Sequence, residues 1–417
     1  MSNHPFRPLR HRHVRLLWIA AVVSDIGTWV QLIVVGSLVA HDTGSAVQTG
    51  LVALATFMPQ GISSPIGGVL ADRYERKKVF SITLMMQAVA TAALAIVLGA
   101  GVRSPGVLTG LILLSAAAGA LGQPSYSAMQ PDLVEPDEMM AMVSLVTYSW
   151  NAGRVIGPLL GTLLALAVGP AWTVGFNAFS FVVLAVAVTR LRRSFRSHGS
   201  LDGTFGERLR GGWRALWTTR GCAYTVAVFI GLNVLVIPFM GLIPIFAKAE
   251  FHGGTGVAGA IASAQGVGSL IGGMSVTVIA DRVRRSNLYA LLIALLSAAL
   301  VGYALAPTRV TVIAAAAVLG AMSSSTIITS IATVQRDAPN HSRGRVLSLF
   351  QAFAGVTYGF GLLLVGALGD ATNLRLAFVV GAAANLLFCL VLAARLPRWR
   401  EAIDGEPSGP DIALANA

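Results

Sequence analysis

Long apolar stretches separated by short polar loops are the feature that most constrains what this chain can fold into. Twelve of them reach about 20 residues or more, enough at ~1.5 Å per residue to cross the ~30 Å hydrocarbon core of a bilayer. They cover residues 15–40, 46–71, 78–101, 105–130, 140–169, 171–191, 221–250, 254–280, 287–306, 308–334, 344–370 and 374–396. The division inside 140–191 depends on Gly169-Pro170, a turn signal. The pattern predicts an all-α integral membrane protein with twelve transmembrane helices.

The composition agrees with lipid as the main solvent. The chain is 55% hydrophobic and 12% charged, with a mean hydropathy of +0.73, whereas soluble domains contain about 25% charged residues. A net charge of +12 could indicate nucleic-acid binding, but the basic residues form short clusters between apolar stretches. Such clusters are typical of cytoplasmic loops of membrane proteins, so no nucleic-acid partner is expected.

Lys and Arg also predict the orientation. With a cytoplasmic N-terminus, 25 of the 30 basic residues fall in inner segments, four fall in outer loops, and Arg154 lies within a span. Both termini are therefore predicted to be cytoplasmic. The basic segment from His4 to Arg15 precedes an apolar stretch that is too long for a signal peptide and lacks a cleavage site, so it is expected to remain as the first helix.

No enzyme signature is present. The chain lacks H-E-x-x-H, G-x-S-x-G and G-x-x-x-x-G-K-[ST] sequences. Cys222 and Cys389 lie in or beside apolar spans without metal-ligand spacing, as expected of small buried hydrophobes. The histidines of the N-terminal segment are interpreted as part of a solvated basic tail. We expect no catalytic residues, no metal and no cofactor, and without an ATP site the driving energy should come from an ion gradient.

The longest inner loop divides the chain. We predict an N-terminal six-helix bundle at 1–191, a cytoplasmic connector at 192–220, a C-terminal bundle at 221–396 and a cytoplasmic tail at 397–417. Within the connector, one helical face collects large apolar side chains, namely Phe205, Leu209, Trp213, Leu216 and Trp217. This pattern favours a helix lying in the membrane interface. It is interpreted as an anchor, with a regulatory site as the alternative.

The two halves of the chain contain similar sequences at corresponding positions. Residues 67–78 read GGVLADRYERKK after the second span, and residues 276–287 read VTVIADRVRRSN after the eighth. The first copy resembles the loop pattern G-x-L-A-D-R-x-x-R-[KR]-[KR] of the major facilitator superfamily. The second copy has Thr277 in place of the glycine but keeps Asp281 and Arg282. The resemblance implies two pseudo-symmetric six-helix bundles with a substrate cavity between repeats near the midplane.

A narrower resemblance is to the branch of enterobactin exporters and drug or natural-product efflux proteins. It is carried by DIGTWVQLIVVGSLVAHDTGSA (25–46), LGQPSYSAMQPDLVEPDE (121–138) and SRGRVLSLFQ (342–351).

The motif loop contains predicted gating residues. Asp281 and Arg282, in the second copy of the motif, are predicted to act in the same way. Gly68 permits close approach of a neighbouring helix, and Asp72 can face the positive end of another helix. The resemblance implies that this partner is the eleventh helix, and that Arg73 and Arg76 pair with acidic groups such as Asp132. These contacts would favour the outward-facing state. The alternative is that the residues only enforce topology.

Two charges lie inside predicted spans, where ionisable groups are rare and usually functional. Asp25 and Arg154 fall at similar depths on helices running in the same direction, and the resemblance implies that the first and fifth helices are neighbours. Burial favours the protonated form of a carboxylate, and a nearby guanidinium favours the charged form. We interpret the two as proton-coupling residues; a fixed structural ion pair and no contact at all are the alternatives.

The segment around Arg154 resembles a motif of the superfamily, and this resemblance implies export. Gly153, Gly157 and Gly161 repeat every four residues and form a smooth packing face, and Pro158 can kink the helix. This segment resembles the antiporter motif G-x-x-x-G-P-x-x-G-G, with Thr162 in place of the last glycine. The chain departs from many drug–proton antiporters in lacking an arginine in the fourth span, and Arg154 is the candidate substitute.

Other polar side chains within spans are predicted to line the substrate cavity, with hydrogen bonding between helices as the alternative. They are Gln31, Gln123, Tyr126, Asn233, Ser324 and Thr329. Pro238 and Pro244 are expected to bend the seventh span.

Together these patterns predict a monomeric, proton-driven exporter of a small amphiphilic drug, antibiotic or siderophore in a bacterial inner membrane, with protons, substrate and lipid as partners. The alternatives are a proton-coupled nutrient importer and a non-transporting sensor or scaffold.

Overall fold

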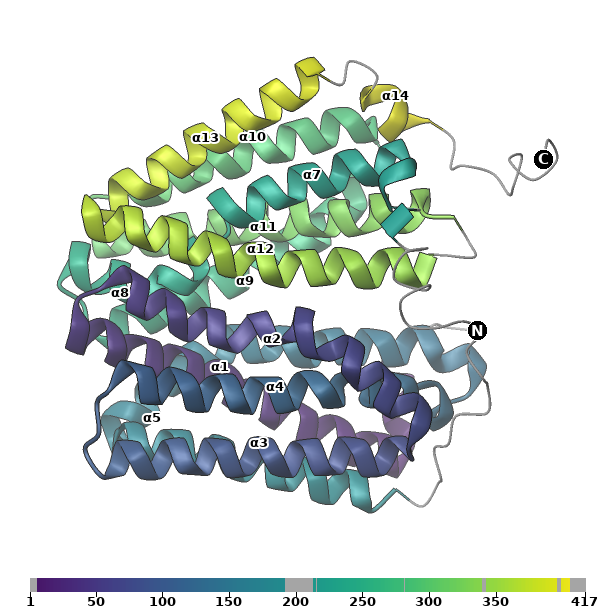
Figure 1. Ribbon diagram of the computed structural model, residues 1–417, viewed down its shortest axis with the longest axis vertical. Coiled ribbons are helices and arrows are strands. Elements are labelled where there is room, and N and C mark those ends of the chain that lie inside the picture. Colours follow the sequence, from purple (N-terminus) through teal and green to yellow (C-terminus); the bar gives the residue numbers. More distant parts are fainter. Residues whose placement is uncertain are drawn as a thin grey trace. The chain divides into compact units, whose positions relative to one another are not determined.

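The computed structural model describes residues 6–191, 213–214, 216–280, 282–339, 343–395 and 399–405. Within these ranges the ordered elements are helices, most of them long (Figure 1). The main helices are α1 (Arg12–Thr43), α2 (Ala46–Arg73), α3 (Arg76–Gly99), α4 (Pro105–Met129), α5 (Met139–Thr189), α7 (Arg220–Leu235), α8 (Phe239–Phe251), α9 (Thr255–Ile279), α10 (Arg285–Ala304), α11 (Arg309–Asp337), α12 (Arg343–Ala371), α13 (Leu374–Arg395) and α14 (Trp399–Asp404). Short 3-10 helices are η1 (Arg7–Arg10), η2 (Pro131–Leu133) and η3 (Pro136–Glu138).

The predicted membrane spans are present as helices. In the described ranges, ten helical stretches are long and apolar enough to cross a membrane. One of them, Pro136–Thr189, contains Gly169 with non-helical dihedral angles (φ 83°, ψ 164°), so it represents two spans. The 28-residue α2 adds a further segment of membrane length. These segments account for the twelve predicted spans, and the all-helical membrane fold is confirmed.

The seventh predicted span is broken. Helix α7 ends at Leu235 and α8 begins at Phe239, with a turn between them that contains Pro238. Pro238 cannot donate a backbone hydrogen bond to the preceding turn, which explains the break. Pro244 lies inside α8.

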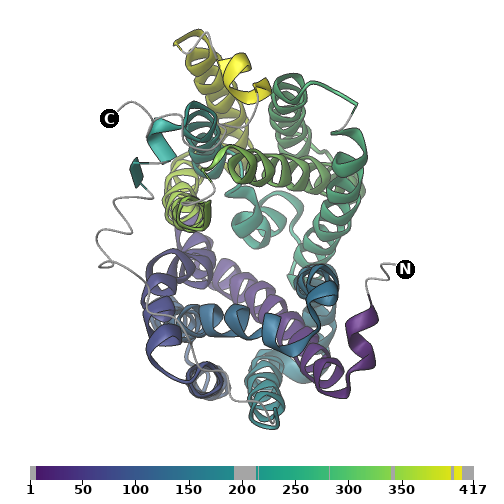
Figure 2. The same ribbon diagram turned by 90° about the vertical axis from the view of Figure 1, so that its right-hand side faces the viewer.

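Helix packing divides the chain into two compact units. Unit 1 comprises Met1–Gly199 with Met240–Gly266, and unit 2 comprises Ser200–Phe239 with Val267–Ala417. Within unit 1, helices α1, α3, α4 and α5 pack side by side (Figure 2). The predicted boundaries at 191, 220 and 396 stay a prediction, and most of the predicted connector lies outside the described residues.

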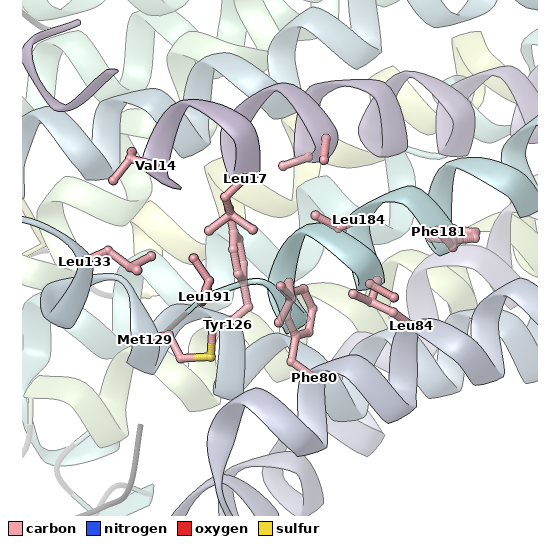
Figure 3. Packing of buried hydrophobic residues seen from close by; sticks show 14 of the residues in the cluster. Val14, Leu17, Phe80, Leu84, Tyr126, Met129, Leu133, Phe181, Leu184 and Leu191 are labelled. Carbon is pink, nitrogen blue, oxygen red and sulfur yellow. The ribbon is translucent and has the colours of Figure 1, made fainter. Parts of the chain in front are cut away.

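A hydrophobic cluster joins α1, α3, α4 and both parts of α5 in unit 1 (Figure 3). Leu17 and Met129 are almost fully buried there. The rings of Phe80 and Tyr126 stack with centroids 4.9 Å apart. Since lipid is as apolar as these side chains, the cluster stabilises the unit mainly through close packing.

Candidate coupling and substrate site

A line of glycines on α5 lies directly against α1. A Cβ atom at Gly153 would come within 2.8 Å of the Asp25 carbonyl carbon, and one at Gly161 within 3.1 Å of the Val30 Cα. At Gly157 the nearest atom would be the Cβ of Trp29, at 2.5 Å. The three glycines, with the buried Pro158 beside them, therefore permit a helix contact that larger residues would prevent.

On α1, Asp25 lies at the N-terminal end of this contact. Its Oδ2 accepts a hydrogen bond from the Oγ of Ser149, which precedes Gly153 by one helical turn on α5. Ser149 is 2% exposed. The carboxylate is thus held by a neutral hydroxyl on the α5 face that packs against α1. Sequence reasoning missed Ser149, because a single serine in an apolar span carries no distinguishing signal.

Arg154 contacts three other parts of unit 1. Its Nε donates to Oε1 of Gln265 on α9 at 3.2 Å, and a terminal nitrogen lies 3.6 Å from the sulfur of Met240 on α8. The guanidinium carbon is 5.9 Å from the centroid of the Trp29 ring, within cation–π range. Although Gly153 brings the two helix backbones together, the named side-chain contacts of Asp25 and Arg154 are with different residues.

Aromatic rings adjoin the guanidinium. Trp29 contacts Trp150 with centroids 5.5 Å apart and Phe57 at 6.1 Å. Trp29 is 9% exposed, and its buried Nε1 has no hydrogen-bond partner among the described residues. An unpaired buried donor is costly, so this N–H is an unsatisfied polar group beside Arg154.

A second polar group lies further along α1. Gln31 Oε1 accepts a 2.8 Å hydrogen bond from Nδ2 of Asn177, and Ser180 Oγ donates to the Asn177 carbonyl at 2.7 Å. All three side chains are buried. The structure therefore places Gln31 in a hydrogen-bonded contact between helices.

Parts of α8 and α9 complete unit 1. A Cβ at Gly259 would contact the Pro158 carbonyl oxygen at 2.8 Å, and one at Gly266 would contact the Arg154 carbonyl oxygen at the same distance. On α8, Lys248 Nζ donates to the carbonyls of Ala40 (3.0 Å) and His41 (2.8 Å). A cation at this position is favourable because the last carbonyls of α1 carry partial negative charge.

The motif loop shows part of the predicted arrangement. Arg76 lies 3.7 Å from the Asp132 carboxylate and donates to the Ala128 carbonyl at 3.0 Å. The close approach of α2 to α4 occurs at Gly67, where a Cβ would lie 2.9 Å from Leu121 backbone atoms, while a Cβ at Gly68 would meet open space.

The remaining predicted gating residues that the structure describes are exposed. Asp72 and Arg73 are exposed, and the Arg73 guanidinium lies over the Tyr74 ring. Arg282 is exposed, and Asp281 lies outside the described residues. A gating role stays a prediction for all of them.

The remaining predicted cavity residues differ in environment. Gln123 is exposed, and Ser324 is half-buried. Asn233 is buried and donates to the Phe229 carbonyl of its own helix at 2.8 Å. Thr329 donates to the Ser325 carbonyl at 2.8 Å. Tyr126 belongs to the hydrophobic cluster of Figure 3.

The basic N-terminal segment makes specific contacts that the sequence did not reveal. Glu138, whose side chain is completely buried, has an oxygen 3.2 Å from Arg7 Nε and 3.1 Å from Arg10 Nε, and its other oxygen is 3.0 Å from His11. Two guanidiniums thus neutralise a buried carboxylate. Arg7 and Arg10 belong to the basic segment from which only the membrane orientation was predicted. In the structure they also hold η1 against the start of α5.

Comparison with known proteins gives a consistent result. Residues 3–414 match the family of transmembrane secretion effectors. The chain is 26% identical over 404 residues to the multidrug efflux pump Tap of Mycolicibacterium fortuitum, which covers 93% of this chain and 96% of that protein. It is 30% identical over 183 residues to the enterobactin exporter EntS of Salmonella typhi, covering 43% and 44% of the two chains.

Solved structures share the fold at low identity. The nucleoside transporter NupG has a TM-score of 0.73 at 14% identity, covering 92% of this chain and 99% of that one. A bacterial homologue of the lysosomal transporter Spinster, in an inward-facing conformation, has a TM-score of 0.74 at 15% identity, covering 97% and 100%. With the family match and the helical architecture, these likenesses show that the chain is a multi-pass membrane transporter, not an enzyme, and belongs to the transmembrane secretion effector family of the major facilitator superfamily.

Proposed function

We propose that the protein is a proton-driven exporter of a small amphiphilic compound, such as a drug, an antibiotic or a siderophore, that works by alternating access. The relative that covers almost the whole chain is named a multidrug efflux pump, and a relative over less than half of it is named an enterobactin exporter. Both names describe outward movement of small molecules, which supports export over import.

The contact between Asp25 and Ser149 is the observation that carries the proton-coupling part. An ionised carboxylate only accepts hydrogen bonds, whereas a protonated one also donates. Protonation of Asp25 would therefore remove a charge from the α1–α5 contact and change its bond to the Ser149 hydroxyl. Both residues lie where the glycine line holds the helices together, so a change of protonation acts directly on helix packing.

The group around Arg154 supports an amphiphilic substrate. A permanent cation and the unpaired Trp29 N–H provide donors for a polar or anionic end. The rings of Trp29, Trp150 and Phe57 provide apolar surface beside them. A compound with an acceptor-bearing end and a flat apolar body matches both features.

The proposal includes a bacterial cytoplasmic membrane as the location and a monomeric state. It also includes cytoplasmic termini, which the distribution of Lys and Arg supports. It also includes two six-helix halves that alternate between inward- and outward-facing states, with the motif-loop residues as gates. A reporter protein that is active only in the cytoplasm should be active when it is fused at the Tyr74 turn.

Transport in inverted membrane vesicles tests the proposal. An imposed pH gradient, acidic inside, should drive uptake of a substrate identified from a panel of amphiphilic dyes and siderophores. Asp25→Asn should lower this uptake to the rate without a gradient, while gradient-independent exchange of labelled for unlabelled substrate persists. Asp42→Asn, an exposed carboxylate near the other end of α1, is the matched control and should transport normally.

Two outcomes would contradict the proposal. Gradient-driven uptake by Asp25→Asn at the wild-type rate would exclude coupling through this carboxylate. Accumulation only in right-side-out vesicles would identify an importer.

A further inference from the structure

A cavity of about 230 Å³ lies wholly within unit 2, between α9, α10 and α11. Its wall contains the guanidinium-bearing residues Arg285 and Arg336, together with apolar side chains from each of the three helices, among them Val276, Leu288 and Ile328. Arg285 and Ile328 are exposed, so the cavity opens at the surface of unit 2. A cavity of mixed charge and apolar character points to a ligand with an anionic group on an apolar body.

Arg336 is held rigidly in the wall. Its Nε donates to Oδ1 of Asp337 and a terminal nitrogen donates to the Ile403 carbonyl of α14, both at 2.6 Å. These two bonds use two of the five guanidinium donors. The group is therefore fixed in place and retains donors for a ligand.

Arg285 adds positive charge at an unfavourable position. It is the first residue of α10, where the helix dipole is positive. Asp404 of α14 caps part of this end, because it accepts hydrogen bonds from the Ser286 backbone N–H (2.9 Å) and hydroxyl (2.6 Å). Among the described residues of this region, Arg282, Arg284, Arg285 and Arg336 outnumber the acidic residues Asp337, Glu401 and Asp404. An anion in the cavity would offset this excess.

The threonine hydroxyls in the wall do not provide further donors. Thr277, Thr329 and Thr333 each donate to a carbonyl of their own helix. Recognition therefore depends on the guanidiniums, which match phosphate oxygens with paired N–H groups.

The size and the location select the ligand. Sites for drug-sized compounds are roughly 300–1,000 Å³, so a cavity of about 230 Å³ suits a head group better than a whole transport substrate. The basic turn before α10 is predicted to face the cytoplasm, and basic pockets between helices on this side favour anionic lipid head groups. We propose that this cavity binds the phosphate of an anionic phospholipid from the inner leaflet.

Lipid retention by the purified full-length protein tests the proposal. Native mass spectrometry should show preferential retention of phosphatidylglycerol over phosphatidylcholine when both are supplied in equal amounts. Arg285→Gln should weaken phosphatidylglycerol binding about ten-fold, the effect expected for the loss of one charge-assisted hydrogen bond. Arg284→Gln removes the same charge from the neighbouring residue, which does not line the cavity, and should weaken binding much less than Arg285→Gln does.

A second variant tests whether binding depends on the volume of the cavity as well as on its charge. Ile328→Trp should fill the cavity and weaken phosphatidylglycerol binding without changing any charge. Equal retention by wild type, Arg285→Gln and Ile328→Trp would overturn the proposal. Displacement of the lipid by millimolar inorganic phosphate or glycerol phosphate would also overturn it, because the site would then recognise a soluble anion.

Discussion

Each unit contains a helix pair packed through glycines, but the polar groups beside the glycines differ. In unit 1 the pair is α1 and α5, with Asp25, Ser149 and Arg154 next to the contact. In unit 2 the pair is α9 and α11, where Cβ atoms at Gly268 and Gly272 would approach Ala317 and Ala321 backbone carbonyl carbons at 2.6 Å.

Neutral hydroxyls support the unit 2 contact. Ser269 Oγ donates to the Gly320 carbonyl at 3.2 Å, and Ser325 Oγ donates to the Gly272 carbonyl at 2.9 Å. Both hydroxyls are satisfied by backbone and neither titrates near neutral pH. Close packing in a bilayer therefore requires small residues in both units, whereas the ionisable side chains beside the unit 1 contact give it the additional chemistry expected of a coupling site.

The largest effect should come from filling either glycine contact. Gly157→Leu in unit 1 and Gly272→Leu in unit 2 should each destabilise the protein by about 3 kcal/mol or more, because overpacking against backbone cannot be relieved by side-chain movement. Unfolding in a denaturing detergent would measure the loss.

Gly110→Leu and Gly302→Leu are the matched controls, since a Cβ at either position meets open space. Both should unfold within about 0.5 kcal/mol of wild type. A tolerated leucine at Gly157 or Gly272 would show that the helices are not held at this distance.

An intermediate effect should separate the chemistry of the two contacts. Arg154→Gln should raise the KM for the exported substrate about ten-fold, as expected for one lost charge-assisted hydrogen bond, with a smaller change in kcat. Arg154→Lys keeps the charge but not the planar fork, and should recover only part of the affinity. Vesicle uptake at several substrate concentrations would distinguish these values. An unchanged KM in Arg154→Gln would remove this residue from the substrate site.

The smallest effect should come from the unit 2 hydroxyls. Ser325→Ala should cost about 0.6 kcal/mol, the average for a hydrogen bond between membrane helices, and should leave the KM and the pH dependence of transport unchanged. Detergent unfolding and vesicle uptake of the same preparation would test both parts. A changed pH profile would show that unit 2 takes part in coupling, which would break the comparison.

The two units can also be compared at their terminal segments, which are η1 in unit 1 and α14 in unit 2. In unit 1, Arg7 and Arg10 neutralise the buried Glu138. In unit 2, α14 is fixed by Asp404 on α10, and the ring of Trp399 stacks on Tyr224 with centroids 5.2 Å apart. Each unit thus has a terminal segment attached by polar contacts that hydropathy does not predict.

The sequence by itself determined the number and approximate position of the spans, because the thickness of the bilayer sets the length of an apolar helix. It also identified the two charges inside spans, Asp25 and Arg154, because charges are rare there and stand out. The glycine spacing of α5 predicted a close helix contact, and the motif at 68–78 indicated the superfamily.

Only the tertiary structure decided which side chains meet. It joined Asp25 to Ser149 and Arg154 to Gln265, and it located the close approach of α2 at Gly67. A membrane helix is apolar on nearly all sides, so its sequence has no strong amphipathic stripe to show how it is rotated. Rotation about the helix axis is fixed by packing against neighbouring helices, and this rotation determines the partner of every buried polar group.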